Sequence, residues 1–324
     1  MSAKHNLKKI LIIRLSSIGD VVLCSHLPRL INNKFADSGG VEVHLLTSRH
    51  IAPLFTNNPY LSKIIRYSSD KIVELNRAVI SEEYDVVLDL QKNSISAKLL
   101  AGYSGDIRQI DKHRKEKLKM VYLKQLPKEV VHVADRYLNT CRDLIEDDGK
   151  GLDLYLGREE ERKEGKLTIG VAPEAFHKTK RWPKDRFAEL IEKLTTDGHN
   201  VRVFGKNESN IGRGNQNVTN YSGKLSLRKT AERINECDYF ISNDTGPMHI
   251  AAACGVPIVL IFGSSVKELG FTPYRVDYEL VEYDIWCRPC SHIGRSFCPL
   301  GHFKCMNKIT VDVVYSEFNK LRNR

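Results

Sequence analysis

The stretch from Tyr239 to Ser264, YFISNDTGPMHIAAACGVPIVLIFGS, constrains the fold of this chain more than any other. Its first apolar run, Tyr239–Ser242, predicts a buried parallel strand, and the run Ile258–Phe262 predicts a second. Between them Pro247 stands at the start of a helix, where a missing N–H costs nothing. The helix ends before the Gly-Val-Pro that precedes the second strand. This order predicts a compact β-α-β unit.

The predicted helix of this unit has a beginning suited to an anion. Its free backbone N–H groups at Gly246, Met248 and His249 would point at a ligand, and phosphate is the commonest one. The alternative is a helix cap without a ligand, because Asp244 and Thr245 precede many helices for that reason alone.

The rest of the chain repeats the alternation of strands and helices, which predicts an α/β fold with doubly wound parallel sheets. A segment rich in charge and glycine, 146–166, predicts a linker between two such series. The chain of 324 residues is long enough for two domains with separate cores. The strands expected are 10–14, 41–46, 64–67, 85–90, 167–172 and 201–204, and the helices are 21–33, 69–82, 135–145, 183–196, 226–236 and 311–321.

Composition narrows the compartment and the partners. No apolar run approaches the ~20 residues that a membrane span needs, and Leu7–Ile13 is too short for a signal-peptide core. We therefore expect a cytoplasmic protein. The net charge of +10 favours a polyanionic partner or an anionic membrane surface. The basic run Lys112–Lys119 fits that partner or an ordinary solvated face. No nucleic-acid motif accompanies it, so we expect no nucleic-acid partner.

Two loops near the N-terminus follow predicted strands, at the edge where such sheets bind ligands. The loop Leu15–Asp20 follows the first strand and ends in a carboxylate. Asp20 is either a helix cap or a carboxylate directed at a ligand. Polar residues 91–93 follow a second buried strand. The absence of a G-x-G-x-x-G pattern argues against a dinucleotide.

Three motifs in this order resemble the ADP-heptose:lipopolysaccharide heptosyltransferases over nearly the whole chain. They are Arg14–Asp20 (RLSSIGD), Lys180–Pro183 (KRWP) and Asn243–Ala253 (NDTGPMHIAAA). The resemblance implies the GT-B fold, two Rossmann-like domains with parallel sheets that face a cleft. We expect an acceptor-binding domain at 1–155, a nucleotide-sugar domain at 156–310 and a helix at 311–324 that packs back towards the first domain.

The resemblance also implies site residues. Asp20 would be the general base of an inverting transfer. Lys180 would neutralise the phosphates, Asp244 would bind heptose hydroxyls, Glu208 would hold the ribose, and Leu225 would lie against the adenine. Thr245, Gly246, Pro247 and His249 would begin the helix facing the pyrophosphate. The loop 172–176, with Glu174, departs from the Pro-Gly-Ala type of the family. For the acceptor we expect Ser17, Gly19, Gln91, His132 and Arg136.

The function implied is transfer of heptose from ADP-heptose to the lipopolysaccharide inner core, by an enzyme peripheral to the cytoplasmic face of the inner membrane. A basic N-terminal domain suits a phosphorylated, Kdo-bearing acceptor. The alternatives are a protein acceptor, a non-catalytic sugar-nucleotide binder, and a basic RNA- or lipid-binding protein. The binder is disfavoured because Asp20, Lys180 and Asp244 are all present. No cofactor is expected for the chemistry.

Four of the eight cysteines form a C-x2-C-x7-C-x6-C cluster at Cys287, Cys290, Cys298 and Cys305. Four thiols this close predict either a structural zinc or iron site or reduced thiols packed under a loop. The cytoplasm disfavours disulfides between them. A protein-heptosylating branch that resembles this family carries a four-cysteine iron finger with different spacing.

Overall fold

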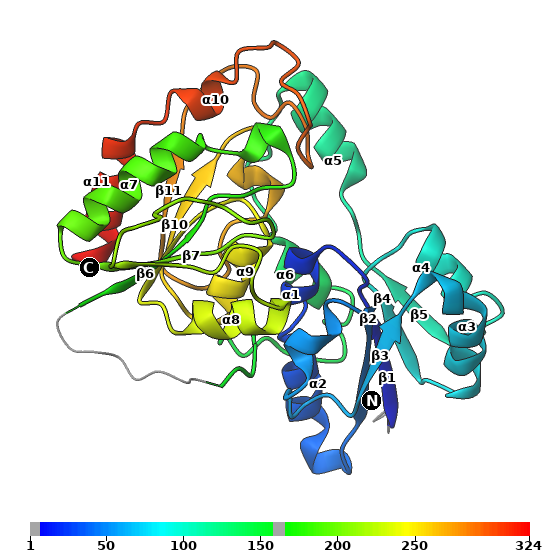
Figure 1. Cartoon of the computed structure of the whole chain (residues 1–324). Helices are drawn as coiled ribbons and strands as arrows, with labels where there is room; N and C mark the ends of the chain where they lie inside the picture. The colour runs from blue at the N-terminus through cyan, green and yellow to red at the C-terminus, as the bar shows by residue number, and fades with distance from the viewer. Residues whose placement is uncertain (1–6, 158–165) are drawn as a thin grey trace. The chain divides into compact units, whose positions relative to one another are not determined.

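The computed structural model describes residues 7–157 and 166–324, which form two compact units (Figure 1). Unit 1 takes in the described residues up to Lys112, and Val133–Tyr155. Unit 2 takes in His113–His132, and the described residues from Leu156 to Arg324. The chain passes between the units at the expected boundary, 155/156. It also passes at 112/113 and 132/133, which the sequence did not predict.

A sheet in the order β3-β2-β1-β4-β5 forms the centre of unit 1, and its neighbouring strands all run parallel. The central strand β1 is almost wholly buried, as expected for an apolar run covered on both faces. The strands are β1 Lys9–Ile13, β2 Glu42–Ser48, β3 Lys63–Tyr67, β4 Val86–Asp89 and β5 Asp106–Gln109. The α-helices are α1 Ile18–Val22, α2 Leu27–Phe35, α3 Ile72–Ser81, α4 Ser94–Leu99 and α6 Val133–Leu138.

Two helices of unit 1 are shorter than the sequence predicted. The helix expected over 21–33 is divided into α1 and α2 by turns at residues 23–26. Pro28 has no N–H to donate to the carbonyl of Cys24, so a continuous helix is unfavourable there. The helix expected over 135–145 ends as α6 at Leu138. The hydroxyl of Thr140 donates to the carbonyl of Tyr137 at 2.7 Å and competes with helical bonding.

Unit 2 has a parallel sheet in the order β11-β10-β9-β6-β7-β8. The predicted β-α-β unit is present as β9, α9 and β10. The strands are β6 Thr168–Ala172, β7 Asn200–Val203, β8 Val218–Asn220, β9 Tyr239–Asn243, β10 Ile258–Phe262 and β11 Tyr278–Glu282. The helices are α5 Arg114–Leu118, a π-helix at Lys119–Leu123, α7 Lys184–Thr196, α8 Leu227–Asn235, α9 Gly246–Ala253, α10 Lys304–Asn307 and α11 Val311–Arg322.

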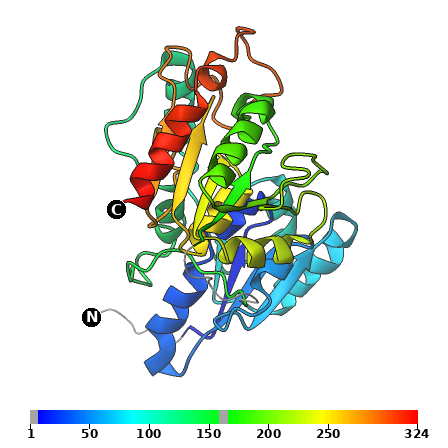
Figure 2. The ribbon, with the colours of Figure 1, turned by 60° about the vertical axis from the view of Figure 1, so that its left-hand side comes forward.

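Helices cover both faces of this sheet. Right-handed crossovers that run in opposite directions from the centre place α7 and α9 on opposite faces. The last helix, α11, lies beside α7 (Figure 2). Its Val314 and Phe318 are fully buried in one core with Phe187 of α7 and Val259 of β10. The helix thus belongs to the core of unit 2, whereas the sequence analysis set it apart from the nucleotide-sugar domain as a helix directed towards the N-terminal domain.

Two buried side chains attach residues 113–132 to the rest of unit 2. Met120 and Val121 are buried, and Met120 packs against Val266, Leu269 and Phe271. Within the described part of the chain, no helix is long and apolar enough to cross a membrane.

Candidate active site

Asp20 and Asp244 follow strands at the point of each sheet where the order of strand connection reverses. In unit 1 this reversal lies between the neighbouring strands β1 and β4, and in unit 2 it lies between β6 and β9. Ligands of open parallel sheets bind beyond the carboxyl ends of such strands. The Arg14–Asp20 loop follows β1, and Asp244 follows β9. Each unit therefore carries its own group of candidate site residues.

In unit 1 the carboxylate of Asp20 accepts from four donors. Arg14 Nη2 lies 2.8 Å from Oδ1, and the Tyr137 hydroxyl donates to the same oxygen at 3.3 Å. The Ser17 hydroxyl donates to Oδ2 at 2.7 Å, and the Ser17 N–H donates at 3.1 Å. The bond from the Ser17 N–H is the reciprocal half of a capping box at the start of α1. Asp20 is thus both a helix cap and a charged group beside a buried cation.

The environment of Asp20 keeps it ionised. Burial alone would raise its pKa, but the charge of Arg14 and the hydrogen bonds from Ser17 outweigh burial and lower the pKa below the usual value. Arg14 is itself buried, donates to the carbonyl of Leu90 and lies over the ring of Tyr137. Sequence reasoning did not assign Arg14 or Tyr137 to the site. The charge ending an apolar strand was the available signal for Arg14.

Four of the five predicted acceptor residues share unit 1 with Asp20. Gln91 Oε1 accepts from the backbone N–H of Leu15 at 3.0 Å and so orders the loop before α1. Gly19 is buried in α1, Ser17 is exposed at its start, and Arg136 is buried next to Tyr137. The fifth, His132, belongs to unit 2. Its Nε2 donates to the carbonyl of Thr272 at 2.8 Å.

In unit 2 the structure brings Lys180 and Asp244 together. Lys180 Nζ lies 2.6 Å from Asp244 Oδ2, and the Ser265 hydroxyl donates to the same oxygen at 2.8 Å. Burial would raise the pKa of Asp244, but the charge of Lys180 and the hydrogen bonds from Lys180 and Ser265 together outweigh burial and lower the pKa below its usual value. The pair is a fixed cation and carboxylate on two different loops. Ser265 was not expected here.

The helix α9 begins directly beside this pair. Thr245 is its N-cap residue, Gly246 and Pro247 are its first two residues, and all three are half-buried. The neighbouring Asn243 is fully buried and joins two loops, since its Nδ2 donates to the Pro173 carbonyl and its Oδ1 accepts from the Trp182 N–H. A helix start favours an anion. The Met248 N–H, which the sequence predicted to be free, donates to the Thr245 carbonyl at 3.2 Å, as is usual in the first turn of a helix. His249 is buried and contacts Phe271 edge-on.

Thr179 holds the backbone that carries Lys180. Its hydroxyl accepts from the Arg295 N–H and from the Ser264 hydroxyl, both at 2.9 Å. Its N–H donates to the Arg295 carbonyl at 3.1 Å, and its own carbonyl accepts from the Ser264 N–H at 3.1 Å. The side chain is 1% exposed. Lys180 is therefore positioned by the loop that follows β10 and by the cysteine-bearing segment.

The family departure at Glu174 has a structural explanation. Glu174 Oε2 accepts from the N–H of Lys206 at 2.7 Å and of Asn207 at 3.3 Å. The carboxylate thus orders the loop after β7 that leads to Glu208. Glu208 lines a cavity of about 600 Å³ together with Lys224 and the buried Ser222. Leu225 follows directly and is half-buried.

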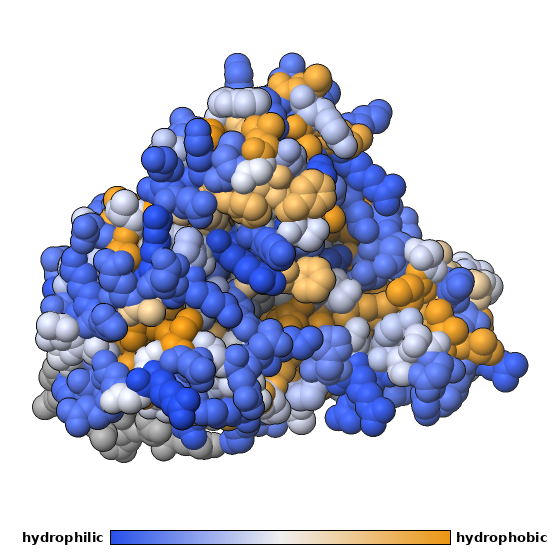
Figure 3. Space-filling view, turned by 45° about the horizontal axis from the view of Figure 1, so that its top comes forward, coloured by the Kyte–Doolittle hydropathy of each residue, from blue (hydrophilic) through white to orange (hydrophobic). Residues whose placement is uncertain are grey.

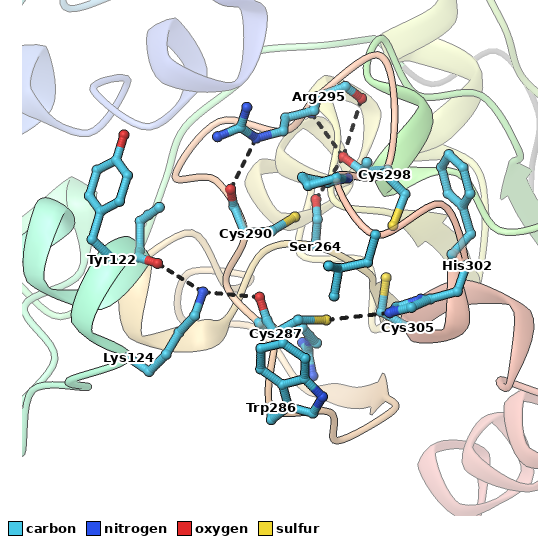
Figure 4. Close-up of a pocket in the computed structure, with 16 residues that line it drawn as sticks. Tyr122, Lys124, Ser264, Trp286, Cys287, Cys290, Arg295, Cys298, His302 and Cys305 are labelled. Atoms are coloured by element: carbon cyan, nitrogen blue, oxygen red, sulfur yellow. Dashed lines mark hydrogen bonds between the residues drawn. The ribbon is translucent and has the colours of Figure 1, made fainter.

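The four clustered cysteines line one cavity of about 250 Å³, and their sulfurs point into it (Figure 4). His302 Nε2 lies 4.0 Å from the sulfur of Cys287. Burial, and then the neighbouring cysteines, raise the pKa of Cys290 and raise that of Cys305 to about 11. Thiolates suit zinc and iron, so the donor set fits a metal. However, in residues 7–157 and 166–324 no three His, Cys, Asp or Glu side chains are arranged to hold an ion.

Comparison with known proteins identifies the family. Glycosyltransferase family 9 (heptosyltransferase) matches residues 72–300, well over half of the chain. The chain belongs to glycosyltransferase family 9. The two parallel Rossmann-like sheets confirm the GT-B fold that the sequence motifs implied, and the family makes the chain an enzyme of the glycosyltransferase type.

Individual relatives agree with this assignment to family 9. Lipooligosaccharide heptosyltransferase 2 of Campylobacter jejuni is 32% identical over 171 residues, which cover 49% of this chain and 52% of the relative. The chain thus spans about half the length of the curated relatives it matches first. A family 9 glycosyltransferase of Veillonella parvula superposes with a TM-score of 0.78 at 20% identity, over 97% of both chains. The E. coli ADP-heptose heptosyltransferase II superposes with a TM-score of 0.70 at 22% identity, over 97% and 98%.

Proposed function

We propose that this chain is an inverting glycosyltransferase that moves heptose from ADP-heptose to an inner-core acceptor of lipopolysaccharide. The observation that carries the proposal is the Lys180–Asp244 pair, 2.6 Å apart beside the start of α9. A cation beside the start of a helix suits a diphosphate, and a carboxylate suits sugar hydroxyls. The family 9 relatives support heptose as the sugar, and the E. coli ADP-heptose heptosyltransferase II supports ADP as the nucleotide.

In the proposed reaction an acceptor hydroxyl attacks the anomeric carbon of heptose, and the bond from that carbon to the diphosphate oxygen breaks. ADP leaves with the electron pair, so negative charge grows on the diphosphate. Lys180 and the N–H groups of α9 would stabilise that charge. Asp244 would bind heptose hydroxyls, Glu208 the ribose, and Leu225 the adenine face.

Asp20 would take the proton of the attacking hydroxyl. Its four donors leave little free acceptor capacity, so the substrate must replace one of them. The exposed Ser17 hydroxyl is the one easiest to displace from Oδ2. The acceptor would then lie among Ser17, Gly19, Gln91 and Arg136, with His132 as a further predicted contact.

The four-cysteine cluster has a separate, structural proposal. We propose that Cys287, Cys290, Cys298 and Cys305 take one zinc or iron ion. When bound, the ion would cross-link the segment that holds Thr179 and would supply no step of the transfer. The sulfurs point into one cavity and must draw together to share an ion.

We also propose a peripheral location on the cytoplasmic face of the inner membrane, because the acceptor named for the relatives is a lipid-linked saccharide. The decisive experiment incubates the purified chain with ADP-heptose and a series of truncated core acceptors and reads the products by mass spectrometry. An added mass of one heptose on a core acceptor, with ADP released, is the expected result. Transfer of heptose to a folded protein, with no transfer to any core acceptor, would show that the acceptor is a protein. ADP-heptose binding without transfer to either would refute the enzyme.

A further inference from the structure

The net positive charge of this chain is concentrated in two segments, 112–128 and 285–311, which belong to unit 2 apart from Lys112. Residues 112–128 hold seven Lys and Arg against one acidic residue, Glu116. Residues 285–311 hold four Lys and Arg and no acidic residue. The excess of ten equals the net charge of +10 of the whole chain. The remaining residues are therefore balanced in charge, although acidic residues resume next to both segments, at Glu129 and Asp284.

The same two segments expose large apolar side chains. In the first, Tyr122 is 71% exposed and Leu123 is 62% exposed. In the second, Trp286 is 76% exposed and Phe297 is 59% exposed. Both segments also expose aliphatic side chains, and Figure 3 shows apolar groups gathered among hydrophilic ones on this face. The further members are Leu118, Leu126, Ile293 and Leu300.

The two segments lie against one another. Lys124 Nζ donates to the carbonyls of Cys287 at 3.1 Å and Pro289 at 2.9 Å. Tyr122, Trp286 and Leu300 line the same cavity (Figure 4). We call the exposed apolar and basic residues of 112–128 and 285–311 the basic-apolar face. Apart from Lys112, its residues belong to unit 2.

We propose that the basic-apolar face docks this protein on a membrane that contains anionic lipid. Lysines would pair with lipid phosphates near the charged surface. Tyr and Trp have an apolar body and a polar tip, which suits the level of the head groups. Exposed Leu and Ile side chains would enter the acyl boundary. The inference deepens the peripheral location proposed above and names the surface responsible.

The aliphatic side chains favour a membrane over a single-stranded nucleic acid. Proteins that bind single strands stack bases on flat aromatic rings, and Leu118, Leu123 and Ile293 offer no such ring. Inward-facing Met120 and Val121 anchor the first segment, so its outward side chains keep a fixed surface.

The experiment is sedimentation of the full chain with vesicles of phosphatidylethanolamine and phosphatidylglycerol, compared with phosphatidylcholine vesicles. We expect binding to the anionic vesicles that weakens as salt rises. The double variants Lys115→Glu/Lys119→Glu and Tyr122→Ser/Trp286→Ser should each lower the affinity about tenfold or more. Melting temperatures establish that each variant is folded.

Matched controls lie on other helices. Arg77→Glu/Lys98→Glu changes two exposed cations in unit 1, and Val73→Ser/Val313→Ser changes two exposed apolar residues. These variants should bind vesicles like the parent. Equal binding to both vesicle types, no binding to either, or equal loss in face and control variants would overturn the proposal. So would preference for single-stranded RNA over anionic vesicles.

Transfer to a soluble, delipidated core acceptor separates this inference from the proposed function. Vesicle binding without transfer would leave the docking face standing and refute the reaction. Transfer without vesicle binding would leave the proposed reaction standing and refute the docking face.

Discussion

Lys180 Nζ and Asp244 Oδ2 lie 2.6 Å apart, so the cation proposed for the diphosphate already has a carboxylate partner. Replacing Lys180 with Ala should weaken ADP binding, because the proposed phosphate contact is removed. Lys180→Arg retains the charge and should bind ADP more tightly than Lys180→Ala. Calorimetry with ADP alone measures both. An unchanged affinity in Lys180→Ala would remove this residue from the phosphate site.

Asp244→Asn separates the sugar from the nucleotide. The variant releases Lys180 from its partner, so ADP affinity should stay the same or rise. Use of ADP-heptose should fall, since a carboxylate that binds heptose hydroxyls is lost. Calorimetry with ADP, set beside steady-state kinetics with ADP-heptose, checks the two halves. A large loss of ADP affinity would mean that Asp244 supports the nucleotide and not the sugar.

Asp20→Asn tests the base. Turnover should fall by about two to four orders of magnitude, the usual size of general-base loss, while ADP affinity stays near the parent value. A purely capping Asp20 would give a different result, with a lower melting temperature and turnover close to normal at low temperature. Measuring kcat together with the melting temperature distinguishes the two roles.

The lowered pKa of Asp20 predicts a pH dependence with a definite sign. A carboxylate whose pKa is lower in the folded state contributes stability that is present above its unfolded pKa, about 3.9. That stability is lost as the pH falls through the folded value. Chemical denaturation between pH 3 and 6 should therefore show a decline below about pH 4 that is smaller in Asp20→Asn. Because the lowered pKa keeps Asp20 ionised, kcat/KM should not fall on account of Asp20 when the pH is lowered from about 7 to about 5.

Thr179→Val tests the support of Lys180. The change leaves the Arg295 N–H without its side-chain acceptor, which should cost about 1–3 kcal/mol of folding free energy. ADP affinity should fall several-fold because the Lys180 backbone loses its restraint, whereas Thr179→Ser should restore both properties. Denaturation and calorimetry measure them. ADP affinity that survives in Thr179→Val would limit Thr179 to stability.

The thiols of the cysteine cluster predict pH-dependent metal uptake. Burial and neighbouring thiols keep the pKa of Cys305 at about 11, so an ion must displace protons to bind. Zinc affinity should rise between pH 6 and pH 8, with about one ion per chain. Cys290→Ser should weaken it and lower the melting temperature of the loaded protein. Elemental analysis and competition with a chelator measure this. Substoichiometric metal with freely titrating thiols would make the cluster ordinary packing cysteines.

Local patterns predicted much of the fold because apolar runs and helix signals are contiguous. The β9-α9-β10 unit lies where the Tyr239–Ser264 stretch placed it. The break between α1 and α2 was missed although Pro28 signalled it. Arg14 and Tyr137 were missed because their roles depend on contacts between residues far apart in sequence. The assignment of 113–132 to unit 2 has no local signal at all, since it rests on packing against Val266 and Leu269.

That assignment has a consequence during synthesis. Met120 is made roughly 150 residues before Val266, which at about 5–20 residues per second means a delay on the order of ten seconds. Throughout that time Met120 lacks the side chains that it packs against in unit 2, Val266, Leu269 and Phe271. The nascent chain therefore exposes an apolar segment between two stretches of unit 1. We expect a ribosome-associated chaperone to bind the nascent chain at this segment.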